Sequence, residues 1–91
     1  MADKRVHVVV TGRVQGVFFR DTTCDLAERL NLTGWVRNRS DGSVEAEFQG
    51  QPAAVDRAVA FCQSGPRHAD VWDVDVECVE PVPDERRFVV H

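Results

Sequence analysis

The sequence contains no tyrosine, a single methionine and only three cysteines among its 91 residues. An odd number of thiols cannot all pair, and none stands in a Cys-x-x-Cys arrangement, so a disulfide framework is not expected. We expect Cys24, Cys62 and Cys78 to be reduced and buried as small apolar groups. The sequence also lacks an apolar run long enough to span a bilayer, so we expect no membrane partner.

Positive charge is scarce, because eleven Lys and Arg residues face fifteen Asp and Glu residues, for a formal net charge of -4. Nucleic-acid binding normally depends on a basic surface, so this balance argues against a nucleic-acid partner. An anionic ligand must then be held by local geometry. The first residues, Met1 to Arg5, lack the apolar segment of a signal peptide, so we expect a soluble, cytoplasmic protein.

Runs of apolar and β-branched residues predict five strands, of which the last is short. They comprise residues 6–11, 35–39, 43–48, 71–78 and 88–90. The first is apolar enough to lie at the centre of a sheet. The fourth alternates, with apolar side chains expected inward and acidic side chains outward.

Two helices are expected between these strands. The first begins at Thr22, because Thr22 and Asp25 resemble a capping box with Asp in place of Glu, and it ends near Asn31. The second opens at Pro52 and ends at Gly65. The order β-α-β-β-α-β, followed by a short extra C-terminal strand, predicts an α+β sandwich of the ferredoxin-like type, with two helices on one face of an antiparallel-rich sheet. We expect a single domain over residues 1–91, and a monomer.

The turn between the second and third strands decides on which face Asn38 lies. A two-residue loop ending at Gly42 would place Asn38 opposite Glu45 and mix apolar with charged side chains on one face. A three-residue loop, with Gly42 in the left-handed region, pairs Asn38 with Val44 and separates the two kinds of side chain. We predict this second register. Asn38 then lies on an otherwise apolar face, where its amide either bonds loop backbone or stays free to hold a water or ligand.

A glycine-punctuated loop, residues 12–20 (GRVQGVFFR), leads from the first strand into the first helix. Glycine permits a tight turn in which several backbone N–H groups point at one spot. The start of the following helix adds free donors and the positive end of its dipole. Arg20 supplies a planar fork that matches phosphate or carboxylate oxygens. These features predict a site for a small anion with several oxygens, and phosphate is the first candidate.

Loop and hairpin together resemble the acylphosphatase family. The family's first motif, G-x-V-x-G-V-x-F-R, is matched by Gly12, Val14, Gly16, Val17, Phe19 and Arg20. Its second, G-W-V-x-N-x-x-x-G-x-V with a further glycine after five residues, is matched by Gly34, Trp35, Val36, Asn38, Gly42, Val44 and Gly50. The resemblance covers essentially the whole chain, including its length and element order. The C-terminal residues depart from it, because many members carry an arginine near their end.

The resemblance implies hydrolysis of the carboxyl-phosphate anhydride of acyl phosphates, which yields a carboxylate and inorganic phosphate. It implies no metal, no cofactor and no covalent intermediate. Arg20 would bind the phosphate, and Asn38 would orient the attacking water. The backbone N–H groups that would form the phosphate cradle belong to Gln15, Gly16, Val17, Phe18, Phe19 and Arg20. Phe18 stands at a variable motif position, where it either shapes the acyl side of the pocket or simply packs.

Two other functions remain open. A non-catalytic ferredoxin-like module would bind an anion or a partner protein without turnover, but the presence of both Arg20 and Asn38 argues against it. An acylphosphatase-like domain could act on carbamoyl phosphate within a larger assembly, as in hydrogenase maturation, but the chain ends soon after the last predicted strand. The acidic row Asp73, Asp75 and Glu77 is expected to be a solvated strand face and not a metal site.

Overall fold

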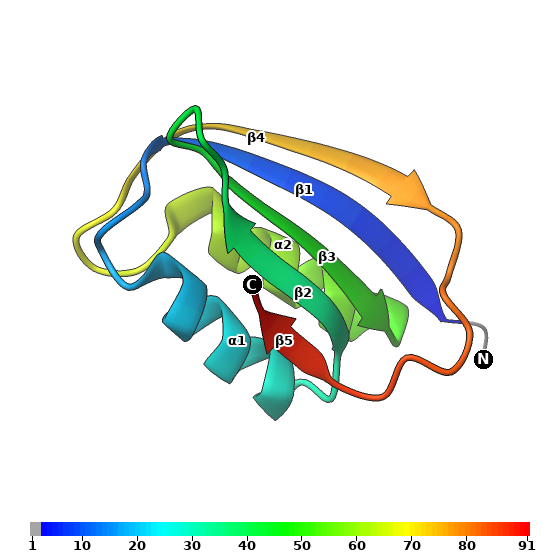
Figure 1. The fold of residues 1–91 in the computed structure, drawn as a ribbon. Coiled ribbons are helices and arrows are strands. Elements are labelled where there is room, and N and C mark those ends of the chain that lie inside the picture. The colour runs from blue at the N-terminus through cyan, green and yellow to red at the C-terminus, as the bar shows by residue number, and fades with distance from the viewer. Residues whose placement is uncertain (1–2) are drawn as a thin grey trace.

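The computed structural model describes residues 3–91, which form five strands and two helices (Figure 1). In chain order these are β1 (Lys4–Arg13), α1 (Phe19–Arg29), β2 (Thr33–Asn38), β3 (Val44–Gly50), α2 (Pro52–Ser64), β4 (Asp70–Val79) and β5 (Phe88–Val90). The predicted order of elements is confirmed. Met1 and Ala2, which belong to the segment expected not to be a signal peptide, lie outside the described residues.

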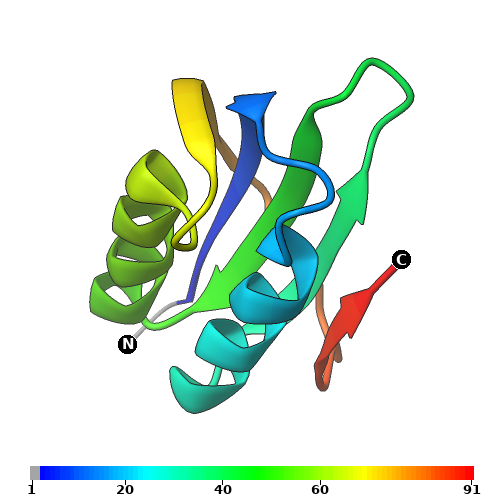
Figure 2. The ribbon, with the colours of Figure 1, turned by 90° about the vertical axis from the view of Figure 1, so that its left-hand side faces the viewer.

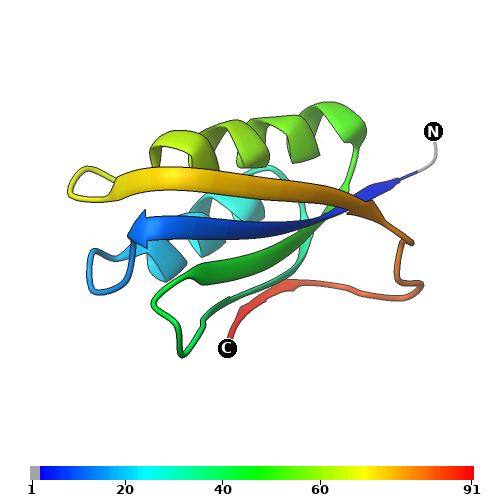
Figure 3. The same ribbon diagram turned by 90° about the horizontal axis from the view of Figure 1, so that it is seen from above.

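All five strands form one sheet in the order β4-β1-β3-β2-β5. Every neighbouring pair is antiparallel except β2 and β5, which run parallel. Both helices lie on the same face of this sheet (Figures 2 and 3), where α1 contacts β2 and β5 and α2 contacts β4 and β1. The predicted ferredoxin-like sandwich is therefore confirmed. Neither helix within residues 3–91 has the length and apolar character needed to cross a membrane.

The core lies between the helices and the sheet. Val6, Val8 and Val10 of β1 are at most 1% exposed, because alternate residues of a strand point to the same face. Ala46 and Phe48 of β3 lie opposite Val8 and Val6 and extend the same apolar layer. The residues between them on β1 therefore point to the opposite face of the sheet.

The hairpin has the register that the side-chain pattern predicts. Asn38 pairs with Val44, and Arg37 pairs with Glu45, which accepts a hydrogen bond of 2.6 Å from Arg37 Nε. The N–H of Arg39 donates to the Ser43 carbonyl oxygen at 2.8 Å and closes the loop. Gly42 has a φ of 95°, as a left-handed turn position requires. The three-residue loop is confirmed.

The first helix begins at Phe19, so the predicted start at Thr22 is wrong. The residue before the helix is Phe18, and no side chain caps the helix end. The N–H of Thr22 donates to the Phe18 carbonyl oxygen at 3.0 Å, which is an ordinary helical bond, so the predicted capping box does not form. Core packing decides this boundary, because Phe19 is 2% exposed and its ring lies 5.8 Å from that of Phe61.

The fourth strand is less buried than its alternation suggests. Trp72 is 70% exposed, so the expectation that apolar side chains of this strand point inward is wrong for Trp72. Val76 pairs with the buried Val8 and does face the helix side of the sheet, but it remains 41% exposed. β4 is an edge strand, and its register against β1 shifts between Thr11 and Gly12, which puts Trp72 out of phase. Gly12 is required at this irregularity, because a Cβ atom there would stand 2.2 Å from the Asp70 carbonyl oxygen. The acidic side chains of β4 do face outward, as expected.

All three cysteines are free thiols. Cys62 on α2 is buried, and burial raises the pKa of its thiol to about 12. Cys24 is half-buried, whereas Cys78 is exposed, so the prediction of a buried thiol is wrong at Cys78. Cys78 lies on the edge strand β4, which has a neighbouring strand on one side only.

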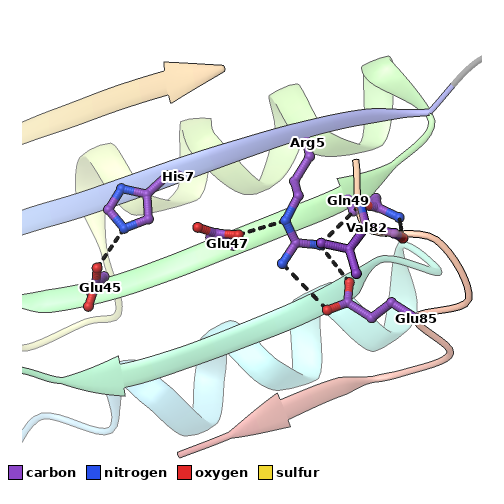
Figure 4. A network of polar contacts seen from close by, with 7 residues as sticks. All are labelled: Arg5, His7, Glu45, Glu47, Gln49, Val82 and Glu85. Atoms are coloured by element: carbon purple, nitrogen blue, oxygen red, sulfur yellow. Dashed lines mark hydrogen bonds and ion pairs between the residues drawn. The ribbon is translucent and has the colours of Figure 1, made fainter. Parts of the chain in front are cut away.

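On the face opposite the helices, Arg5 fastens the segment that leads to β5 (Figure 4). Arg5 is 3% exposed, and its guanidinium donates to Glu47 at 2.6 Å and to Glu85 at 2.7 Å. Burial alone would lower the pKa of Arg5, but the hydrogen bonds to Glu85 and Glu47 raise it, so the side chain stays charged. Gln49 exchanges two hydrogen bonds with the backbone of Val82, at 2.7 and 2.9 Å. These contacts hold residues 80–87 against the sheet.

Thr23 is 1% exposed, and its hydroxyl finds no hydrogen-bond partner within the described chain. We expect Thr23→Val to stabilise the protein by about 1 kcal/mol, because the substitution keeps the shape and removes an unpaired buried polar group. Thermal unfolding should shift upward by about 5 °C. The control is Thr22→Val at the half-buried neighbouring position, which should bring no such gain. A destabilised Thr23→Val protein would show that the hydroxyl is satisfied in solution.

The Arg5 network gives a second prediction. We expect Arg5→Met to lower the free energy of unfolding by about 2–3 kcal/mol, since two partly buried carboxylates lose their common partner. Lys4→Met is the matched control, because Lys4 forms only an exposed ion pair with Asp56 and its loss should change little. Urea denaturation of both variants measures the difference. If Arg5→Met and Lys4→Met were equally stable, the hydrogen bonds of Arg5 to Glu47 and Glu85 would make no net contribution to stability.

Candidate active site

A cavity of about 250 Å³ opens where the loop after β1, the start of α1 and the end of β2 meet. The loop and the β2–β3 turn lie at the same end of the molecule (Figures 1 and 3). The lining residues are Val14, Gly16, Phe18, Phe19, Arg20, Asp21 and Asn38. The fold thus brings Arg20 and Asn38, which come from different elements, to one cavity.

The loop enters α1 through two residues with left-handed backbone. Gly16 has a φ of 74° and Phe18 a φ of 62°. Turns that contain left-handed residues can point neighbouring backbone N–H groups toward a common side of the chain. The first N–H groups of a helix have no acceptor within it, and here no side chain caps them. Together with the helix dipole, these donors favour an anion at this end of the cavity.

Gln15 ties the loop to the hairpin. Its side-chain amide donates to the carbonyl oxygens of Arg39 at 2.7 Å and Ser43 at 2.8 Å. One of the two roles considered for Asn38 was a hydrogen bond from its amide to loop backbone. The amide of Gln15 makes a contact of this kind instead. The half-buried Asn38 amide lines the cavity, and no hydrogen bond within residues 3–91 engages it. This arrangement favours the second interpretation of Asn38, an amide free to hold a water or ligand.

The hairpin that carries Asn38 is held by polar contacts on both sides. Asp41 accepts hydrogen bonds from the Ser43 hydroxyl at 2.6 Å and the Ser43 N–H at 3.0 Å, which lower the pKa of Asp41. Burial would raise the pKa of Glu45, but its hydrogen bonds with His7 and Arg37 lower it. Both carboxylates are therefore ionised near neutral pH, and the turn keeps its shape there.

The C-terminal segment reaches Arg20. β5 pairs with β2 so that Val90 lies beside Val36, and the N–H of His91 donates to the Val36 carbonyl oxygen at 2.8 Å. The main-chain oxygen of His91 then accepts a hydrogen bond of 3.0 Å from Arg20 Nη1. Because a guanidinium has five donors, most of them stay available to a ligand. Sequence reasoning missed this contact, since it joins segments that are far apart in the chain and involves main chain.

The cavity contains most, but not all, of the residues that the sequence nominates. Gly16, Phe18, Phe19, Arg20 and Asn38 line it. Gln15 and Val17 do not; Gln15 reaches the hairpin, and Val17 packs against the core. A role for their backbone N–H groups in a phosphate cradle stays a prediction.

Two lining residues were missed. Val14 is a fully buried residue of the loop, and Asp21 follows Arg20 in the first turn of α1. The preference of the helix dipole for acidic side chains in the first turn was the available signal for Asp21. Cys24 does not line the cavity. Burial raises the pKa of its thiol, and the negative charge of Glu28 raises it further. Within residues 3–91, no three His, Cys, Asp or Glu side chains gather in a way that could hold a metal ion.

We expect Gln15→Ala to loosen the loop, because both hydrogen bonds that join its side chain to the hairpin are lost. Backbone order parameters of residues 14–18 should fall from values near 0.85, typical of rigid backbone, to about 0.6 or below. NMR relaxation measures them. Gln63→Ala, which removes an exposed glutamine from α2, is the control and should leave the loop unchanged. Unchanged order parameters in Gln15→Ala would mean that packing alone keeps the loop rigid, without the hydrogen bonds of Gln15.

Comparison with known proteins identifies the family. The acylphosphatase family model matches residues 6–90. An acylphosphatase of Rubrobacter xylanophilus is 61% identical over 81% of this chain and 67% of its own length, and one of Anaeromyxobacter dehalogenans is 50% identical over 99% and 98%. The structure of an acylphosphatase from Coxiella burnetii superposes with a TM-score of 0.92 at 39% identity, covering 99% of this chain and 94% of that one. Family and fold support the hydrolysis of acyl phosphates, and the chain belongs to the acylphosphatase family.

Proposed function

We propose that this protein hydrolyses acyl phosphates, with Arg20 and loop backbone N–H groups binding the phosphoryl group and Asn38 orienting the attacking water. The observation that carries the proposal is the cavity shared by Arg20 and Asn38 at an uncapped helix N-terminus. A cation and free backbone donors suit the phosphoryl end of the substrate. A neutral amide without a protein partner suits the water.

The phosphoryl group would lie against the loop and the start of α1. The guanidinium of Arg20 is planar and presents paired donors to two phosphoryl oxygens. Its hydrogen bond to His91 orients it before substrate arrives. Backbone N–H groups between Gln15 and Arg20 complete the cradle. All these donors also meet the charge that develops on the phosphoryl oxygens in the transition state, where their contribution is largest.

Asn38 would position the water without acting as a base, because an amide does not titrate near neutral pH. The oxygen of the water attacks phosphorus, and the bond from phosphorus to the acyl oxygen breaks. A carboxylate leaves, and the water proton passes to a phosphoryl oxygen of the substrate. The products are the carboxylate and inorganic phosphate, so atoms and charge balance without a further reactant.

The hydrolysis of an acyl phosphate needs few catalytic groups. A carboxylate is already a good leaving group, so catalysis needs mainly positioning and charge stabilisation. Arg20 supplies the charge, and the rigid hairpin places Asn38. We therefore propose that the reaction requires no metal ion.

Steady-state hydrolysis of benzoyl phosphate, measured with a chelator present, tests the proposal. We expect turnover in the wild type, and a loss of about 10³-fold in Arg20→Ala together with loss of inhibition by inorganic phosphate. Asn38→Ala should lose about 10²-fold or more while phosphate still inhibits at nearly the wild-type concentration. Arg13→Ala is the matched control, because Arg13 is exposed beside the loop and outside the cavity lining.

Other outcomes would point elsewhere. A folded wild type that binds phosphate without turnover would favour the non-catalytic binding module. Turnover confined to carbamoyl phosphate, assayed in parallel, would favour the specialised alternative. Loss of phosphate inhibition in Asn38→Ala as severe as in Arg20→Ala would contradict the division of roles between these two residues.

A further inference from the structure

The proposed chemistry gives no role to the side chain of Phe18. It is 77% exposed, more than any other large apolar side chain that is exposed in the described chain. Single exposed apolar residues are common on protein surfaces, so exposure alone carries no function. Phe18 differs because it also lines the cavity that contains Arg20 and Asn38.

The backbone of Phe18 is as unusual as its exposure. Its φ of 62° and ψ of 25° lie in the left-handed region, which bulky residues rarely adopt. Such conformations persist only where the surrounding structure enforces them, and they cluster at functional sites. The neighbouring Phe19 is 2% exposed and packs against Phe61. Phe19 is thus buried in the core, whereas Phe18 stays exposed at the cavity.

The other cavity walls do not offer a comparable surface. Val14 is fully buried, and Gly16 has no side chain. The charged groups are Arg20, which the proposed mechanism assigns to the phosphoryl group, and the Asp21 carboxylate. A flat apolar group that stacks on the Phe18 ring removes both surfaces from water. A negatively charged acyl group would instead approach the Asp21 carboxylate and be repelled.

We propose that Phe18 forms an acyl subsite that favours acyl phosphates with an aromatic acyl group. This inference rests on the proposed function. In an in-line displacement the leaving acyl oxygen lies on the side of phosphorus opposite the attacking water. Asn38 comes from the end of β2 and Phe18 from the loop before α1, so the water and the acyl group contact residues of different elements.

The test compares kcat/KM for benzoyl phosphate with kcat/KM for acetyl phosphate. The two substrates differ in intrinsic reactivity, but this difference cancels when the ratio for a variant is divided by the ratio for the wild type. Phe18→Ala should lower the ratio by about fivefold, because the aromatic contact is lost, with the inhibition constant of inorganic phosphate unchanged. Phe18→Trp should retain the ratio. Trp72→Ala is the matched control, since it removes a ring that is 70% exposed and lies outside the cavity lining.

Each contrary result has a distinct meaning. An unchanged ratio in Phe18→Ala, with normal phosphate inhibition, would overturn the subsite and leave the proposed hydrolysis intact. Equal losses for both substrates, with weaker phosphate inhibition, would make Phe18 a support of the loop and also overturn the subsite. A wild type that hydrolyses neither substrate would overturn the proposed function, and the subsite with it.

Discussion

The attachment of the loop after β1 to the β2–β3 turn is the contact on which the site depends. Gln15 makes it with two hydrogen bonds to the carbonyl oxygens of Arg39 and Ser43. The positions of these two carbonyl groups are set by the hairpin, which closes through a three-residue loop with Gly42 in the left-handed region. The same register turns Asn38 to the apolar face. One local choice of turn therefore sets both the position of the loop and the direction of the amide.

The two faces of the sheet serve the site in different ways. The face under the helices supplies the core into which Phe19 packs, and this packing sets where α1 begins. The opposite face carries the Arg5 network, which holds residues 80–87 to the sheet (Figure 4). Those residues lead to β5, whose parallel pairing with β2 brings the His91 backbone to Arg20. The Arg5 network thus holds the segment that leads to the main chain contacting Arg20.

The two adjacent phenylalanines of the loop differ in burial and in conformation. Phe19 is buried and anchors the helix, whereas Phe18 takes a left-handed conformation and stays exposed at the cavity. A bulky residue in that conformation is disfavoured when considered alone. Its cost is offset by the packing on either side of it, because Val17 and Phe19 both contact the core. The same turn leaves the first N–H groups of α1 without a side-chain cap beside the cavity.

The sequence by itself determined the order of elements, the hairpin register and the nomination of Arg20 and Asn38, because periodicity, turn chemistry and motif spacing are local properties. The tertiary structure decided what depends on neighbours distant in the chain. It moved the start of α1 to Phe19, where core packing outweighs capping preference. It left Trp72 and Cys78 exposed, because strand alternation does not reveal an edge position. It also joined His91 to Arg20 through main-chain atoms, for which no side-chain pattern exists.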